Sequence, residues 1–404
     1  MSKATDGFFE KKRVWSTTKD ELLQNYLKVY FVKIFATRKD VLYIDAFAGQ
    51  GVFDDGKKGS PLIAYDAYEF ACDTSKSPQN VFWRFVEPKY YEQLTHNVEK
   101  IKNCETVNGT YENNVIPIIS ELSNGKNVFI YIDPFGVKSM KFEILREISK
   151  IQESAYSIEL LINFNSFGFI REACRVLKIE PDLNNQDLTE VPDEENNQNS
   201  SVNCLNEIAG GDYWIDIIHK HQDERGRCDG IAAEKEFMSI YRRNLYRLFK
   251  YVLDMPILLR DGGRPVYRMI HLTNHVDGCI LMAENMLTRS KVHVAEIQRR
   301  GQPDLFANTN QDLEGNFVSE KEVSQKLLDL LNNSKGSVLL QNFLAEFYTI
   351  NGALCRVKEL KELLLEMEKN GIIEVIRFEN KKRVNKKFMN TRDNEKLVLL
   401  SKVE

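Results

Sequence analysis

The stretch V-L-Y-I-D-A-F-A-G-Q-G, residues 41–51, decides the fold of this chain. A short apolar run delivers Asp45, and the glycines Gly49 and Gly51 follow it closely. Glycine permits a tight turn and a close approach of the backbone to a ligand. A strand that ends in such a turn is typical of a nucleotide-binding α/β sheet.

More segments of the same kind follow along the chain. Apolar runs of strand length lie at residues 81–86, 128–132 and 156–164, and helical patterns lie at 61–71, 90–102 and 141–151. Strands that alternate with helices predict a parallel sheet with helices on both faces. The apolar runs are continuous, as expected for strands that are buried on both sides.

Polar residues mark the ends of these predicted strands. Asp45 ends the first strand, Glu87 follows the second, Asp133 follows the third, and Asn163 or Asn165 ends the fourth. In open sheets of this kind, ligands bind beyond the carboxyl ends of the strands. We therefore expect the functional site at this edge of the sheet.

The glycine turn predicts a cofactor other than a dinucleotide. The dinucleotide fingerprint G-x-G-x-x-G requires a third glycine, but residue 54 is Asp. Asp45 would also repel a pyrophosphate, so a ligand with a positive charge is favoured, such as the amino acid end of S-adenosylmethionine. Glu87 is placed to accept hydrogen bonds from both hydroxyls of a ribose. A nicotinamide-dependent dehydrogenase is disfavoured for the same reasons.

The stretch I-Y-I-D-P-F-G, residues 130–136, predicts the acceptor site. Pro134 holds the preceding Asp133 in an extended conformation. The Asp133 carboxylate and a carbonyl of the turn could accept hydrogen bonds from an exocyclic amine, and Phe135 could stack on the base that carries it. The alternative is an ordinary turn at a strand end with a buried Phe.

Taken in order, these motifs resemble those of class I S-adenosylmethionine-dependent methyltransferases. The tetrad at 133–136 is similar to the Asp-Pro-Pro-Tyr of amino-methylating enzymes and to the Asp-Pro-Phe-Gly of tRNA guanine-N2 dimethyltransferases. More narrowly, the chain resembles the three-Cys-motif partner proteins, a bacterial family named after a neighbouring gene product. The residues that carry this resemblance are Lys19, Leu23, Tyr26 and Leu27, the stretches 43–51 and 131–136, Gly59-Ser60-Pro61-Leu62, and Leu272-Thr273-Asn274-His275.

The resemblance implies a Rossmann-like methyltransferase fold with S-adenosylmethionine as its cofactor. The acceptor would lie at Asp133, Pro134 and Phe135, and the family name implies a protein partner encoded nearby. Tyr111 precedes a helix-like stretch where a methyltransferase reads the adenine. The residues implied near the cofactor are Asp45, Phe47, Gly49, Gly51, Glu87 and Tyr111.

The rest of the chain predicts a second domain. We expect the methyltransferase domain at 1–300, with an acidic insertion at 181–203, then a linker at 301–318 and a winged-helix domain at 319–404. The basic residues expected at the tip of the wing are Lys381, Lys382, Arg383, Lys386 and Lys387. A wing tip is a natural phosphate contact, although a solvated charge run is the alternative. Residues 320–404 hold 16 basic and 13 acidic side chains, a net charge of only +3.

Composition limits the remaining choices. The 404 residues include 55 basic and 59 acidic side chains, so the net charge of −4 provides no global attraction for nucleic acid. No uncharged apolar run approaches the roughly 18 residues of a membrane span. The seven cysteines form no close pair, so neither a disulfide framework nor a metal site is expected. We expect a cytoplasmic protein.

Two functions remain after these steps. The first is an S-adenosylmethionine-dependent methyltransferase that acts on an exocyclic amine of a nucleic-acid base, with RNA favoured over DNA. The second is a non-catalytic scaffold or sensor with the same fold, which binds a protein partner through its winged helix. An intact acceptor motif beside an intact glycine turn favours the enzyme.

Overall fold

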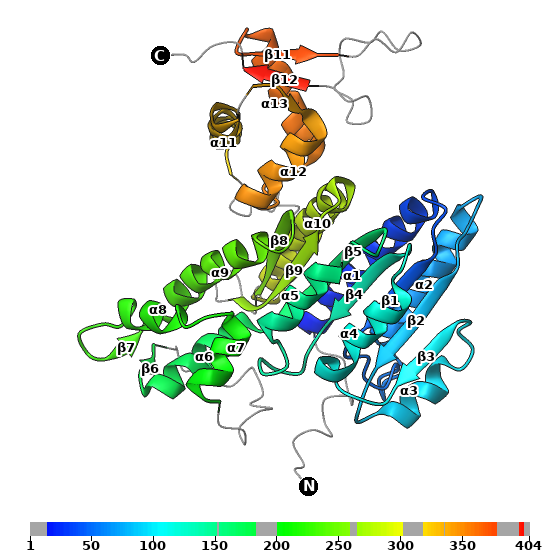
Figure 1. Ribbon diagram of the computed structural model, residues 1–404. Coiled ribbons are helices and arrows are strands. Elements are labelled where there is room, and N and C mark those ends of the chain that lie inside the picture. The colour runs from blue at the N-terminus through cyan, green and yellow to red at the C-terminus, as the bar shows by residue number, and fades with distance from the viewer. Residues whose placement is uncertain are drawn as a thin grey trace. The chain divides into compact units, whose positions relative to one another are not determined.

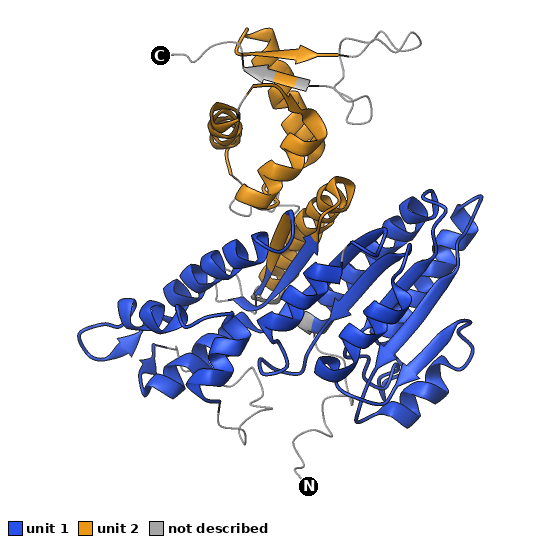
Figure 2. Cartoon of the chain, viewed as in Figure 1, with its two compact units in different colours: residues 1–250, 256–272 blue, residues 251–255, 273–404 orange. Residues whose placement is uncertain are grey.

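A computed structural model describes residues 14–151, 153–182, 200–258, 265–301, 318–334, 336–377 and 396–399. The chain forms two compact units, coloured separately in Figure 2. Unit 1 comprises Met1–Lys250 and Pro256–Leu272, and unit 2 comprises Tyr251–Met255 and Thr273–Glu404. Unit 2 thus includes residues 273–300, which the sequence analysis assigned to the first domain.

The helix α10 (Val276–Gly301) explains the shifted boundary, because it packs on α12 (Leu340–Asn351) inside unit 2. The Gln341 amide donates a hydrogen bond to Asp277 over 2.6 Å, and the Cys279 thiol donates to the carbonyl oxygen of Ala345 over 3.5 Å.

A seven-stranded sheet has the order β3-β2-β1-β4-β5-β9-β8. Its strands are β1 (Val41–Asp45), β2 (Val81–Val86), β3 (Cys104–Val107), β4 (Asn127–Ile132), β5 (Ser157–Phe164), β8 (Tyr251–Leu258) and β9 (Pro265–Thr273). The pairs among the first five strands are parallel, which confirms the predicted α/β sheet. Strands β8 and β9 are neighbours joined by residues 259–264, a connection too short for a parallel crossover. They form a hairpin at the edge of the sheet.

Helices cover both faces of this sheet. Helices α1 (Val14–Phe35) and α2 (Ser60–Thr74) lie on one face, and α4 (Tyr111–Leu122) and α5 (Phe142–Ile151) lie on the other (Figure 1). The other elements of unit 1 are α3 (Tyr91–Val98), α6 (Ser166–Leu177), β6 (Glu180–Pro181), α7 (Val202–Ala209), α8 (Trp214–Lys220), β7 (Arg227–Cys228) and α9 (Gly230–Tyr246).

An aromatic row fills the sheet face under α1 and α2. Tyr43 of β1 is in register with Trp83 of β2 and with Phe129 of β4, and its ring stacks on Phe129 at 5.7 Å between centroids. Side chains two positions apart on a strand point to the same face. The polar residues at 45, 87, 133 and 163 therefore continue this row at the carboxyl edge of the sheet.

Polar contacts fix α1 across the sheet. The Tyr26 hydroxyl donates to the buried carboxylate of Glu159 on β5. His271 Nε2 lies 3.1 Å from the same carboxylate. Lys19 precedes Tyr26 by seven residues, about two helical turns, so both side chains lie on the same face of α1.

Some elements differ from the expectation. The helix expected at 90–102 ends at Val98, and the edge strand β3 follows it. A turn and β7 separate α8 from α9, because Asp223 accepts hydrogen bonds from the backbone N–H groups of Arg225 and Arg227.

Unit 2 continues after α10 with three helices and a small sheet. These elements are α11 (Glu320–Asn333), β10 (Val338–Leu339), α12, α13 (Val357–Lys369), β11 (Ile373–Ile376) and β12 (Lys396–Leu399). The three strands are antiparallel, in the order β10-β12-β11. Among all the helices that the structure describes, none has the length and apolar character needed to cross a membrane.

Candidate functional site

The order of the strands reverses at β1, which pairs with β2 on one side and with β4 on the other. Such a reversal is the topological switch point at which open α/β sheets bind ligands. The glycine turn begins here: the Ala46 N–H donates to the Tyr131 carbonyl over 2.9 Å, and the Ala48 N–H donates to the Val86 carbonyl over 3.1 Å. The turn is thus fixed to both neighbouring strands.

Backbone geometry explains the glycines of this turn. Gly49 and Gly51 have φ angles of 59° and 81°, which other residues rarely adopt. The loop that follows folds back on the turn, and the Gly59 N–H donates to the Gly51 carbonyl over 2.8 Å. A Cβ atom on Gly59 would lie 3.0 Å from that carbonyl oxygen. The N-terminus of α2 is therefore held beside the turn.

Asp45 is fully buried at the end of β1. Its Oδ1 accepts a hydrogen bond from the Phe47 N–H over 3.2 Å, and its side chain also accepts one from Ser60. Its Oδ2 has no hydrogen-bond partner among the described residues. Burial raises the pKa of Asp45 to about 7, and the nearby Asp133 and Glu87 add to this rise, although the Ser60 and Phe47 hydrogen bonds oppose it. A cationic donor would satisfy Oδ2 and restore the charge.

Glu87 is also buried, but the backbone already occupies most of its carboxylate. It accepts hydrogen bonds from the N–H groups of Gly49 at 3.0 Å, Lys89 at 2.7 Å and Tyr90 at 3.0 Å. A carboxylate has about four acceptor positions. Glu87 therefore ties the glycine turn to the start of α3 and retains room for about one further donor, whereas the sequence suggested two ribose hydroxyls.

Phe47 and Tyr111 pack against each other beside the turn, with ring centroids 5.5 Å apart. Tyr111 is the first residue of α4 and is 1% exposed, whereas Phe47 is partly exposed. Burial raises the pKa of Tyr111, and its hydroxyl has no partner among the described residues. Phe47 thus presents the accessible aromatic surface of this pair.

Asp133 lies directly after β4, and its carboxylate forms an ion pair with a lysine from α1. Lys19 Nζ lies 2.9 Å from Oδ1 and 2.8 Å from Oδ2, and the two side chains are only 10% and 23% exposed. Lys19 also lies over the ring of Tyr267, 5.4 Å from its centroid. Burial alone would lower the pKa of Lys19, but the charges of Asp133, Tyr267 and Asp20 together outweigh this effect, so the pKa lies above its ordinary value.

Two sheet residues complete the contacts of Asp133. The Asn163 amide nitrogen donates to Oδ1 over 2.7 Å, and the Tyr131 hydroxyl donates to Oδ2 over 3.2 Å. Asn163 is 1% exposed, and its own Oδ1 has no partner among the described residues.

After Asp133 the chain turns outward: Pro134 is buried, and Phe135 is 42% exposed. The alternative of a buried Phe at this turn is therefore wrong.

Sequence reasoning did not assign a role to Lys19, Asn163 or Ser60. Lys19 and Ser60 belonged to the residues that carried the family resemblance, and Asn163 lay at a strand end, but no spacing along the chain pairs them with Asp45 or Asp133.

The wing residues Lys381, Lys382, Arg383, Lys386 and Lys387 lie outside the described residues, as do most of the acidic insertion and of the linker. In the part of the chain that the structure describes, no His, Cys, Asp and Glu side chains gather as a metal site.

No protein-family model and no curated protein matches the chain. Among solved structures, a Legionella pneumophila protein of the family model DUF519 is 10% identical, over 63% of this chain and 85% of that one, with a TM-score of 0.35. A type I restriction-modification methyltransferase subunit from Streptococcus thermophilus is 11% identical, over 66% of this chain and 45% of that one (TM-score 0.29). Loganic acid methyltransferase is 9% identical, over 69% and 84% (TM-score 0.27).

The last two of these similar structures are methyltransferases. Their identities and TM-scores are low, so the fold of this chain rests on the strand order and register of its own sheet.

Proposed function

We propose that the chain is an S-adenosylmethionine-dependent methyltransferase that acts on an exocyclic amine of a nucleic-acid base. One observation carries the proposal: the fully buried Asp45 has an unpartnered oxygen at the switch point of the sheet. A buried carboxylate oxygen without a hydrogen-bond donor is costly, so a cationic ligand group at this place would be bound strongly. The ammonium of S-adenosylmethionine is such a group.

The residues around Asp45 fit the rest of this cofactor. The backbone at Gly49 and Gly51 permits close approach, and Glu87 retains an acceptor position for a ribose hydroxyl. Phe47 offers a partly exposed ring, and Tyr111 packs against that ring. When bound, S-adenosylmethionine supplies an electrophilic methyl group.

The acceptor would lie at Asp133, Pro134 and Phe135, beside the Asp45 site. Phe135 is 42% exposed, and we propose that its ring stacks on the base, as aromatic side chains do with extruded bases. An amine becomes more acidic as it is alkylated, so the site needs little base strength. Its main contribution is to place the amine nitrogen in line with the methyl group.

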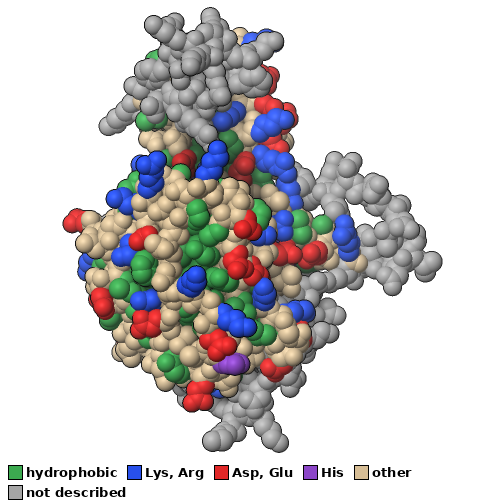
Figure 3. Space-filling view, turned by 90° about the vertical axis from the view of Figure 1, so that its right-hand side faces the viewer, with side chains coloured by type: hydrophobic (Ala, Val, Ile, Leu, Met, Phe, Trp, Pro, Cys, Tyr) green, Lys and Arg blue, Asp and Glu red, His purple; other side chains and the backbone are tan. Residues whose placement is uncertain are grey.

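Unit 2 supports a nucleic-acid target through its order of elements. Its order is α11, β10, α12, α13, β11 and β12, which would suit a winged-helix domain with the basic residues at 381–387 at the tip of its wing. On the face shown in Figure 3, Lys and Arg side chains alternate with Asp and Glu, so the described residues of this face provide no continuous basic surface. Phosphate binding would therefore depend on the wing. We retain RNA as the favoured target.

One observation favours the alternative, a scaffold that binds a protein partner. The third helix of a helix-turn-helix domain usually enters the major groove, but α13 carries Glu359, Glu362, Glu366 and Glu368 against three lysines. An acidic helix is poorly suited to that position. The same helix could dock on a basic protein surface.

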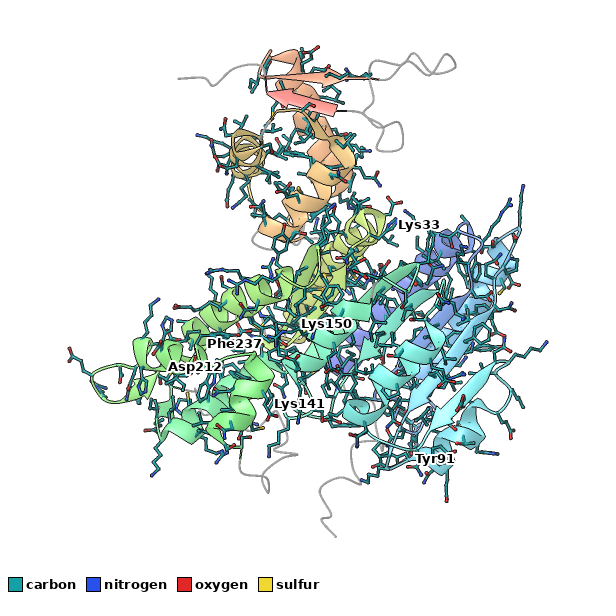
Figure 4. All side chains as sticks on the ribbon, viewed as in Figure 1. Lys33, Tyr91, Lys141, Lys150, Asp212 and Phe237 are labelled. Atoms are coloured by element: carbon teal, nitrogen blue, oxygen red, sulfur yellow. The ribbon has the colours of Figure 1, made fainter. Side chains whose placement is uncertain are left out.

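Methyl transfer tests the proposal directly. Radiolabelled S-adenosylmethionine would be incubated with the protein and with pools of RNA and DNA oligonucleotides. Asp133→Ala should abolish transfer and leave cofactor binding nearly intact, whereas the exposed Asp212, labelled in Figure 4, provides the control Asp212→Ala. Collapse of cofactor binding in Asp133→Ala would contradict the division of roles.

The wing has its own test. Replacement of Lys381 and Lys382 by Glu should weaken nucleic-acid binding and lower its dependence on salt, because fewer counterions are released. An unchanged salt slope would remove the wing from the proposal and would favour the protein-docking alternative.

A further inference from the structure

The Asp133 carboxylate is saturated with hydrogen-bond donors in this structure. Its Oδ1 accepts from Lys19 and Asn163, and its Oδ2 accepts from Lys19 and Tyr131. A carboxylate offers about four acceptor positions, and all four are used. An acceptor amine therefore cannot bind to Asp133 unless one of these donors leaves.

Lys19 differs from the other two donors. Asn163 and Tyr131 are held within β5 and β4 and are neutral, whereas Lys19 reaches Asp133 from α1 through a flexible four-carbon side chain. It is also the only one of the three whose donor is an amine nitrogen. Lys19 thus resembles, in chemistry and in contacts, the group that the acceptor site is expected to bind.

Electrostatic repulsion would also disfavour a Lys19 ammonium that stayed on Asp133 during methyl transfer. Positive charge develops on an amine nitrogen as it accepts a methyl group from a sulfonium, so an ammonium beside it would destabilise the transition state. The pKa of Lys19 lies above its ordinary value, so its charge persists at neutral pH. An unfilled acceptor remains nearby, since Asn163 Oδ1 has no partner among the described residues.

We propose that the Lys19 ammonium holds the place of the acceptor amine, and that the substrate binds by exchanging with it on Asp133. The exchange makes Lys19 a specificity-determining residue. A primary amine can donate one N–H to the vacated position on Asp133 and the other to Asn163 Oδ1, whereas a carbonyl group cannot donate to either. Adenine, cytosine and guanine carry such an amine, and uracil does not. This inference rests on the proposed function and names the group that its acceptor site selects.

Variants of two lysines on one helix test the exchange. Lys19→Met removes the competing ammonium and keeps an unbranched side chain that is only one atom shorter. Lys33→Met is the matched control, because Lys33 is exposed near the C-terminal end of α1 (Figure 4). Adenosine, cytidine, guanosine and uridine would be titrated calorimetrically into each protein in the presence of saturating S-adenosylhomocysteine.

The exchange predicts that at least one amine-bearing nucleoside binds Lys19→Met about tenfold more tightly than wild type or Lys33→Met. Uridine should show no such gain. Equal or weaker binding of all amine-bearing nucleosides in Lys19→Met, or no binding of any nucleoside, would overturn the exchange. Failure of S-adenosylhomocysteine to bind the wild type would instead refute the proposed function.

A measurement on the wild type guards against a Lys19→Met variant that does not fold. Acetic anhydride acetylates accessible lysines, and mass spectrometry compares Lys19 with Lys33 in one sample. Lys19 should be protected in the free protein, and a saturating amine-bearing nucleoside should raise its acetylation severalfold, with no rise for uridine. Unchanged protection of Lys19 under saturation would show that it stays on Asp133.

Discussion

Asp45 and Asp133 end neighbouring strands of one sheet and face the same side, yet their carboxylates have opposite surroundings. Asp133 receives four hydrogen-bond contacts, including two from a lysine. Asp45 is more deeply buried, receives two neutral donors, and has one oxygen without a partner among the described residues. Asp133 has a cationic partner, the Lys19 ammonium, whereas the hydrogen-bond donors to Asp45 are neutral.

The difference indicates what each place can bind. At Asp45 the missing cation has to come from a ligand, and binding would relieve the cost of burying the carboxylate. At Asp133 the cation is already present, so a ligand has to compete with it. The first place suits a cofactor held tightly, and the second suits a substrate that is admitted selectively.

The largest effect should come from the pH dependence of stability at Asp45. Its pKa of about 7 in the folded protein exceeds the value of 3.8 expected in the unfolded chain. The folded state therefore binds more protons between these values, and stability is lost as the pH rises through this interval, by up to about 4 kcal/mol. Asp45→Asn should lack this loss in urea unfolding measured from pH 4 to 8.

Asp212→Asn is the control for that comparison, because Asp212 is exposed. Parallel stability curves for wild type and Asp45→Asn would show that Asp45 titrates normally and that its burial carries no functional meaning.

A somewhat smaller effect is expected at Asp133. Asp133→Ala leaves the Lys19 ammonium buried without its counter-ion, which should lower the free energy of unfolding by about 3 kcal/mol. The double variant Lys19→Met with Asp133→Ala should regain most of this loss, since both charges are then absent. A double variant as unstable as the single one would mean that the ion pair has no energetic coupling.

The affinity for S-adenosylhomocysteine should also depend on pH. Asp45 has to be ionised to bind an ammonium, and with a pKa of about 7 its ionised fraction rises about tenfold from pH 6 to pH 8. The dissociation constant should fall by about that factor over this interval. A constant value, measured by calorimetry, would argue that the ligand amine binds elsewhere.

The smallest effect concerns Ser60, at the start of α2. Ser60→Ala removes a hydrogen bond to Asp45 and should lower the free energy of unfolding by about 1 kcal/mol. It should also raise the pKa of Asp45, so the pH dependence of cofactor binding should shift upward. An unshifted profile would show that Ser60 does not contact the ionised carboxylate.

Sequence reasoning located the strands and their polar ends because those signals are local. Continuous apolar runs ended at Asp45, Glu87 and Asp133, and the structure places these residues at one edge of one face. The short strand β3 gave no such signal, since its residues are only partly buried.

The partners of the carboxylates could not be predicted in the same way. Lys19 lies 114 residues before Asp133, and their pairing depends on how α1 crosses the sheet. Similarly, Glu87 has the expected position, but its carboxylate accepts hydrogen bonds from three backbone N–H groups, because the glycine turn and the start of α3 both lie against it. Such contacts follow from tertiary packing, and no pattern along the chain contains them.

Calorimetric titration with S-adenosylhomocysteine tests the central claim most directly. The wild type should bind with roughly micromolar affinity, while Asp45→Ala and Glu87→Ala should lose binding and Asp212→Ala should retain it. That result would establish the cofactor site at the switch point of the sheet. No binding by a folded wild-type protein, or equal binding by Asp45→Ala, would contradict the account and leave the scaffold as the better explanation.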